Sequence, residues 1–136
     1  MNKILTDSVE IKSNASSIAE IEKAADVFFQ QASLSQEMYG KVYLALIEAS
    51  ENAIRHGNKQ DPNKKVKVSF EKNERQIILK IKDSGEGFDF SLVPDPTLPE
   101  NIDKPNGRGL FIISNLSDEL EFNDLGNEII ITFNID

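Results

Sequence analysis

The chain of 136 residues has no cysteine and no apolar run long enough to cross a membrane. The missing cysteines exclude disulfides and thiolate metal sites. The missing run of about 18 apolar residues excludes a spanning helix. The first residues turn acidic at Asp7, which is too early for a secretory signal peptide. We therefore expect a soluble cytoplasmic protein that has no membrane as a partner.

Basic residues are also scarce. The chain has 15 lysines and arginines against 23 acidic residues, which gives a formal net charge of -8. Its densest basic cluster is the short segment 64–67. Proteins that bind nucleic acid usually carry a larger basic patch, because they neutralise phosphates. We therefore expect no direct nucleic-acid binding, while an acidic surface is consistent with a basic protein partner.

The length and a hydrophobic content of 39% fit one domain, 1–136, with an ordinary core. Hydrophobic periodicity predicts the elements, and Ser13 or Asn14 and then Ser35 are the expected helix caps. The predicted order is a strand over 4–11, helices over 15–32 and 36–57, strands around 66–70 and 77–81 joined by a turn at 72–74, a helix over 107–116, and strands over 118–123 and 127–135. This order predicts an α+β two-layer sandwich, with helices on one face of a mixed, mostly antiparallel sheet.

The segment 89–106 carries no periodic pattern. Four prolines forbid regular structure there: Pro94, Pro96, Pro99 and Pro105. A loop of this length in a small domain is usually functional or disordered. Because it ends where the glycine-rich helix start at 107–109 begins, we interpret it as a lid that closes on bound phosphates.

The second predicted helix carries a narrow polar stripe. Lys41, Glu48, Asn52 and Arg55 fall on one face at about 100° per residue. A solvated stripe is one interpretation. The other is chemical, because the Asn52 amide supplies the hard, uncharged oxygen that Mg²⁺ accepts. Glu48, one turn away, is then placed to orient or deprotonate a hydroxyl.

Asp83 continues the parity of Ile77, Leu79 and Ile81, so it extends the buried face of its strand. A buried carboxylate needs a partner, and the exocyclic amine of adenine is a suitable donor. Gly85 and Gly87 allow the backbone to approach a flat base. A simple turn after the strand is the alternative interpretation.

Gly107 and Gly109 open the next predicted helix, with Arg108 between them. Free N–H groups and the positive end of the helix dipole bind phosphates. Arg108 is expected to reach a terminal phosphate or a protein partner, or to be an ordinary exposed arginine. Lys104 is a weaker candidate of the same kind.

These motifs resemble those of the GHKL ATPase superfamily, which contains gyrase, histidine kinases and the mismatch-repair ATPases. The Glu-x-x-x-Asn helix matches the N box, Asp83-x-Gly85-x-Gly87 the G1 box, and Gly107-x-Gly109 the G2 box. Within that group the chain looks like the anti-sigma-factor serine/threonine kinases. It has near-minimal length, His56-Gly57 directly after the N box, and a Pro-rich loop that leads into Gly-Arg-Gly-Leu-Phe. The resemblance covers about the whole chain.

The resemblance implies the Bergerat ATP-binding fold, ATP and Mg²⁺ as cofactors, and a role for each matched residue. Glu48 is the implied general base for the acceptor hydroxyl, Asn52 the Mg²⁺ ligand and Asp83 the reader of adenine. The implied nucleotide contacts are Asn52, Asp83, Gly85, Gly87, Lys104, Gly107, Arg108, Gly109, Leu110 and Asn127. The family often has a Gly-Thr pair before the last strand, whose threonine contacts the adenine side. Here the pair is Gly126-Asn127, and Asn127 is expected to substitute through its amide.

The implied function is an anti-sigma regulatory factor with serine/threonine kinase activity. Its implied partners are a STAS-type anti-sigma-factor antagonist, which it phosphorylates, and a sigma factor, which it binds reversibly. Family members are often homodimers. Two alternatives stay open at this point. One is a non-catalytic, nucleotide-gated protein-binding switch, and the other is the ATP-binding half of a histidine kinase.

Overall fold

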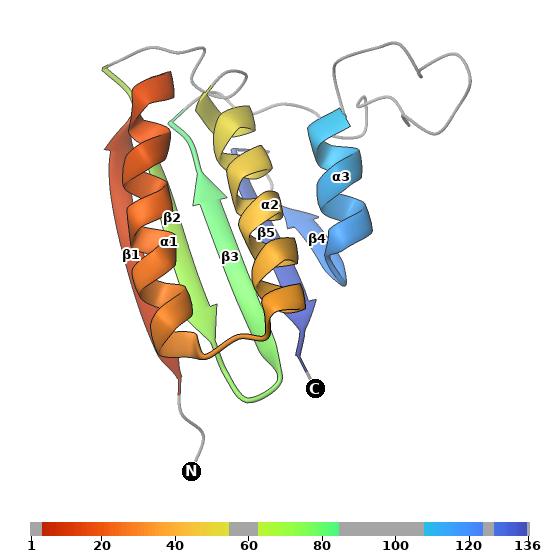
Figure 1. Ribbon diagram of the computed structural model, residues 1–136. Coiled ribbons are helices and arrows are strands. Elements are labelled where there is room, and N and C mark those ends of the chain that lie inside the picture. Colours follow the sequence, from red (N-terminus) through yellow and green to blue (C-terminus); the bar gives the residue numbers. More distant parts are fainter. Residues whose placement is uncertain (1–3, 55–62, 85–107, 124–126, 136) are drawn as a thin grey trace, which may run out of the picture.

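The computed structural model describes residues 4–54, 63–84, 108–123 and 127–135, and the side chains of all of these except residues 15 and 108–110 (Figure 1). The elements are β1 (Leu5–Lys12), a 3₁₀ turn (Ala15–Ser17), α1 (Ile18–Ala32), α2 (Gln36–Asn52), β2 (Lys65–Lys72), β3 (Gln76–Lys82), α3 (Arg108–Leu116), β4 (Glu119–Phe122) and β5 (Glu128–Asn134). Every predicted element is present. The predicted lid, 89–106, lies outside the described residues.

The strands form a single five-stranded sheet in the order β1-β2-β3-β5-β4. All four neighbouring pairs are antiparallel, so the described strands include no parallel pair, although a mixed sheet was expected. The three helices cover one face of this sheet (Figure 1). The α+β two-layer prediction is confirmed.

The core lies between the helices and the inner face of the sheet. Alternate residues of each strand point inward, so Phe70 pairs with Leu79, and Leu79 pairs with Ile131 on β5. All three are essentially inaccessible to solvent. Phe28 of α1 stacks on Phe70 with ring centroids 5.1 Å apart, which joins the two layers.

Polar side chains bond to the backbone at the start of the 3₁₀ turn before α1 and at the start of α2. The Asn14 Oδ1 accepts a hydrogen bond of 3.1 Å from the Ser17 N–H, and the Ser35 Oγ accepts one of 3.2 Å from the Met38 N–H. The Ser35 cap satisfies an N–H group that has no partner inside α2, whereas the Ser17 N–H also bonds to the Asn14 carbonyl oxygen at 3.1 Å. The prediction for Ser35 is confirmed, whereas Asn14 caps the 3₁₀ turn Ala15–Ser17, and α1 itself begins after Ser17 without a side-chain cap.

The hairpin between β2 and β3 turns one residue later than predicted. Lys72 still pairs with Ile77, so it belongs to the strand and not to the turn. The Asn73 Oδ1 accepts hydrogen bonds from the Arg75 and Gln76 N–H groups at 2.9 and 2.8 Å. This local bonding explains why the reversal is centred on 73–75.

The second helix keeps its α-helical form through Asn52 and continues with a wider, π-type turn at Ala53 and Ile54. Its predicted end at Gly57-Asn58 lies outside the described residues. Within the described part of the chain, no helix combines the length and apolar character needed to cross a bilayer.

Candidate functional site

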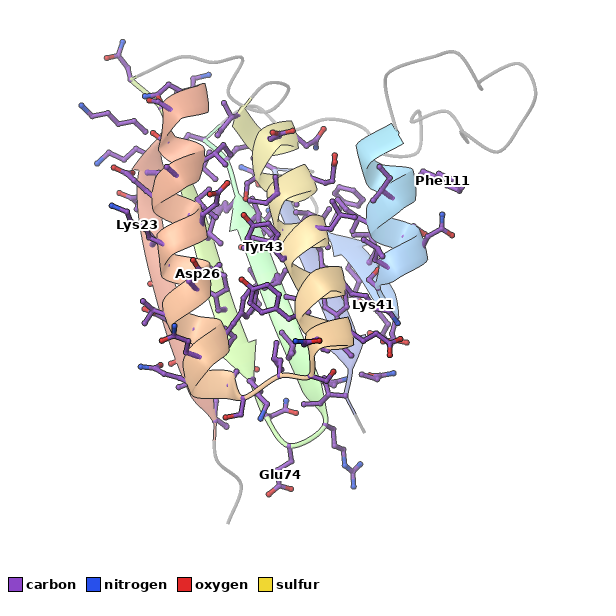
Figure 2. All side chains as sticks on the ribbon, viewed as in Figure 1. Lys23, Asp26, Lys41, Tyr43, Glu74 and Phe111 are labelled. Carbon is purple, nitrogen blue, oxygen red and sulfur yellow. The ribbon has the colours of Figure 1, made fainter. Side chains whose placement is uncertain are left out.

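One end of the molecule gathers the polar positions of the predicted motifs. The last turn of α2, the end of β3 and the start of β5 and α3 all lie at this end, opposite the β2–β3 turn that carries Glu74 (Figures 1 and 2). The second helix packs against both α3 and β3. Residues that are far apart in the sequence are therefore presented on neighbouring elements.

Glu48 and Asn52 lie one turn apart on α2, and both side chains are half-buried. The core-facing side of the same helix is fully buried, as at Val42 and Leu46. Lys41, the third predicted member of the stripe, forms an ion pair with Glu37, with 3.7 Å between the charged atoms. Glu48 and Asn52 therefore lie at the border between the buried and the exposed side of α2. Arg55, the fourth member, lies outside the described residues.

Asp83 and Asn127 face each other one residue beyond the regular β3–β5 pairing, which ends at Lys82 and Glu128. The Asp83 N–H donates a hydrogen bond of 2.9 Å to the Asn127 carbonyl oxygen. Both residues are buried, with 8% and 9% of their surface exposed. Both continue the inward parity of their strands, so they lie side by side on the helix-covered face. The prediction that Asp83 extends the buried face is confirmed.

Two oxygen donors of α2, the Asn52 amide and the Glu48 carboxylate, are of the chemical kind that Mg²⁺ accepts. Among the residues that the structure describes, no group of three or more histidine and acidic side chains could hold a metal ion. Mg²⁺ commonly takes one or two protein oxygens and completes its shell with phosphates and water. The half-buried Asn52 amide can supply such an oxygen beside the acidic Glu48.

The glycine-rich motifs are described only in part. Gly85, Gly87, Lys104 and Gly107 lie outside the described residues. For Arg108, Gly109 and Leu110 the backbone is described and forms the first turn of α3. This turn lies at the same end of the molecule as the end of β3 and the start of β5 (Figure 1). The phosphate-binding role of these residues remains a prediction.

The structure adds Asn123 to this end of the sheet, a residue that the motifs did not indicate. Its Oδ1 accepts hydrogen bonds from the Asn127 and Glu128 N–H groups at 3.0 and 3.2 Å. Its Nδ2 donates a hydrogen bond of 2.6 Å to the Asn127 Oδ1. Asparagine after a strand often makes such side-chain bonds to nearby backbone, which was the available signal.

A buried hydroxyl lies between the two helix candidates. Ser50 is inaccessible to solvent, and its Oγ has no hydrogen-bond partner within the described part of the chain. It is two positions from both Glu48 and Asn52 in the sequence, and it belongs to the buried side of α2.

A shallow hollow also opens on the helix-free face of the sheet. Its lining includes Lys67, Ser69, Ile78 and Lys80, and it contains no residue of the three motifs. Successive strand residues point to opposite faces, so this hollow is separated from Asp83 and Asn127 by the sheet itself. It is not the candidate site.

The chain is similar to known protein kinases over much of its length. It is 29% identical over 96 residues to the serine-protein kinase RsbW of Bacillus mycoides, and 30% identical over 96 residues to the serine-protein kinase RsbW of Bacillus cereus. Each match covers 65% of this chain and 59% of the relative. The matched part thus spans less than two thirds of either relative.

A family model describes the chain more completely. The model of the histidine kinase-like ATPase domain matches residues 11–133, which run from the end of β1 to the end of β5. The match includes every residue of the three motifs together with Asn123 and Asn127. The antiparallel sheet with helices on one face is consistent with such a domain. The chain therefore belongs to the family of histidine kinase-like ATPase domains.

Proposed function

We propose that this protein is an ATP-dependent serine/threonine kinase and anti-sigma factor. In this proposal it phosphorylates a STAS-type antagonist and reversibly binds a sigma factor, with phosphorylation of the antagonist freeing the kinase for the sigma factor. The observation that carries the proposal is the placement of Glu48 and Asn52, half-buried on α2, at the end of the fold where Asp83 pairs with Asn127. Similarity to two serine-protein kinases supports it.

Each described residue has a distinct proposed task. Asp83 accepts a hydrogen bond from the adenine amine. Asn52 holds Mg²⁺, which when bound compensates the charge of the phosphates. Glu48 accepts the proton of the substrate hydroxyl while that oxygen bonds to the γ-phosphorus. The bond between that phosphorus and the bridging oxygen breaks, and ADP leaves. The first turn of α3 offers N–H groups to the phosphates.

The test is intact-mass spectrometry of a candidate STAS protein after incubation with this protein and Mg-ATP. We expect the STAS protein to gain the mass of one phosphoryl group. The Glu48→Gln variant is expected to bind ATP and to transfer at least about a hundredfold more slowly, which is the usual contribution of a general base. Asn52→Ala is expected to lose both Mg²⁺-dependent nucleotide affinity and transfer.

A matched control is Glu51→Gln, which removes the same charge from the same helix at a position that borders the proposed stripe but does not belong to it. Glu51 is one helical position from Asn52 and is half-buried as well. Equal loss of transfer in both variants would contradict a specific role for Glu48. Tight ATP binding without transfer to any STAS protein would instead support the alternative, a nucleotide-gated protein-binding switch.

A further inference from the structure

We propose that Asn123 is a positioning residue that turns the Asn127 amide so that its Nδ2 amine faces the bound base. In this arrangement Asn127 donates a hydrogen bond to adenine N1, while Asp83 accepts one from the adjacent amine. This rests on the proposed function in one respect, namely that the end of the sheet with Asp83 and Asn127 receives the adenine. It adds a specificity mechanism and a residue outside the three motifs.

The orientation of the Asn123 amide is set by the backbone. Its Oδ1 lies 3.0 Å from the Asn127 nitrogen and 3.2 Å from the Glu128 nitrogen. Both nitrogens belong to N–H groups, which can only donate. The atom that meets them must therefore be the carbonyl oxygen. Glu128 is the first residue of β5, so the sheet holds these donors in place.

The orientation of the Asn127 amide follows from that of Asn123. With its oxygen engaged, Asn123 has only its Nδ2 amine to offer to Asn127. The amine lies 2.6 Å from the nearest atom of the Asn127 amide, which must therefore be the acceptor Oδ1. The Asn127 Nδ2 is the group that remains, and within the described residues it donates no hydrogen bond.

The resulting pair of functional groups matches one edge of adenine. Asp83 presents an acceptor and Asn127 presents a donor, and the two residues are joined through their backbones at 2.9 Å. Adenine offers a donor at its exocyclic amine and an acceptor at the neighbouring N1. Guanine offers the reverse order, an acceptor at O6 and a donor at N1. The pair therefore favours ATP over GTP, because guanine N1–H would meet the Asn127 Nδ2 donor and guanine O6 would meet the Asp83 carboxylate, so neither hydrogen bond to the base could form.

The probe is 1-deaza-ATP, in which a C–H group replaces the N1 acceptor. We expect the wild-type protein to bind it about tenfold more weakly than ATP, since one hydrogen bond is lost and the Asn127 amine is left unpaired. Isothermal titration calorimetry with both nucleotides measures this ratio. In Asn127→Ala the ratio is expected to fall to about one, because the donor is absent for both nucleotides.

The Asn123→Asp variant tests the positioning role. Aspartate keeps the oxygen that accepts from the two backbone N–H groups, but it replaces the Nδ2 donor by a second acceptor. The Asn127 amide then turns its amine toward the introduced carboxylate and presents its oxygen to adenine N1. We expect ATP to bind less tightly than 1-deaza-ATP, so the wild-type preference inverts. If Asn123 had a purely structural role, Asn123→Asp would lower the affinity for ATP and for 1-deaza-ATP by the same factor.

Two variants control this test. Asn115→Asp introduces the same charge at an exposed position of α3 and is expected to keep the wild-type ratio. In an Asn127→Thr background the hydroxyl can rotate to donate, so Asn123→Asp is expected to leave the ratio near its wild-type value. Circular dichroism of each variant confirms the fold.

The outcomes separate this proposal from the function on which it rests. A wild-type protein that binds ATP and 1-deaza-ATP equally overturns the role of Asn127, and an unchanged ratio in Asn123→Asp overturns the positioning role of Asn123. In both cases the wild-type protein still binds ATP. A wild-type protein that binds neither nucleotide overturns the proposed function and this proposal together.

Discussion

At the scale of single residues, the two tyrosines of the chain share one environment. Tyr39 and Tyr43 stack on α2 with ring centroids 5.9 Å apart, and Tyr43 lies between α1 and α2 (Figure 2). The Tyr39 hydroxyl donates a hydrogen bond of 2.9 Å to the Asp26 carboxylate, and this bond raises the pKa of Tyr39 above 10.0. Burial, and then the charge of Glu22, raises the pKa of Tyr43. Both phenols therefore hold their protons more tightly in the folded state.

A pH titration of the tyrosinate absorbance tests this environment, because the chain contains no other tyrosine. We expect both phenols to ionise above pH 10.0, and Asp26→Asn to lower the pKa of Tyr39. A raised folded-state pKa means that its stabilisation is complete below pH 10 and is lost as the pH rises through the folded-state value. Tyr39→Phe is therefore expected to flatten the loss of stability in that range. Equal slopes for the wild type and Tyr39→Phe would contradict the effect.

Ser33 has a left-handed backbone, with φ of 54° and ψ of 49°, at the end of α1. Within the described residues no other non-glycine residue has a positive φ. Glycine adopts this conformation without the clash at Cβ. We expect Ser33→Gly to raise the free energy of unfolding by about 0.5–1 kcal/mol, measured by urea denaturation. Ser114→Gly, at an exposed position inside α3, is the control and is expected to lower it by about 0.5 kcal/mol.

At the scale of elements, α2 begins at a cap that is remote from the candidate site. Ser35 lies at the first turn of the helix, while Asn52 lies at its last. We expect Ser35→Ala to lower the free energy of unfolding by about 1 kcal/mol, because the Met38 N–H loses its acceptor. Nucleotide affinity, measured by calorimetry, is expected to stay unchanged. A loss of affinity that matched the loss of stability would show that the two ends of α2 are coupled.

The elements were largely predictable because their patterns are local. Alternation placed Val66, Val68 and Phe70 on the inner face, and helical spacing placed Glu48 beside Asn52. The turn was predicted one residue too early, at 72–74, because the alternation of the strand residues does not indicate the hydrogen bonds of the Asn73 side chain. Such bonds depend on where a side chain meets the backbone, which periodicity does not encode.

The candidate site was predictable to a different degree. Strand parity indicated Asp83, since inward positions continue past the end of the apolar run. Asn127 came only from comparison with the family pattern. Asn123 was missed, because its part in the site consists of contacts with Asn127 and Glu128 across the end of the sheet. A contact of this kind has no sequence spacing that marks it.

At the scale of the whole molecule, the proposed nucleotide contacts come from α2, β3, β5 and α3. All of these elements must therefore be folded before ATP can bind. Since ATP then binds only the folded state, it is expected to raise the free energy of unfolding. The expected gain is about 2.7 kcal/mol at a free concentration a hundred times the dissociation constant. Thermal unfolding at increasing Mg-ATP concentration measures it. An unfolding temperature that does not change with Mg-ATP would contradict nucleotide binding by the folded chain.

The hydrogen bond from the Asp83 N–H to the Asn127 carbonyl oxygen closes one end of the β3–β5 ladder. At the opposite end of the same two strands, the Ile135 N–H donates to the Arg75 carbonyl at 2.8 Å. Ladder ends open more often than their centres, so both amides are expected to exchange hydrogen with solvent at measurable rates. A base held between Asp83 and Asn127 would close one end and leave the other unchanged. The Asp83 amide is therefore expected to exchange more slowly when the base is bound, while the Ile135 amide exchanges at an unchanged rate. The ratio of the two exchange rates then measures occupancy of the site in a single sample.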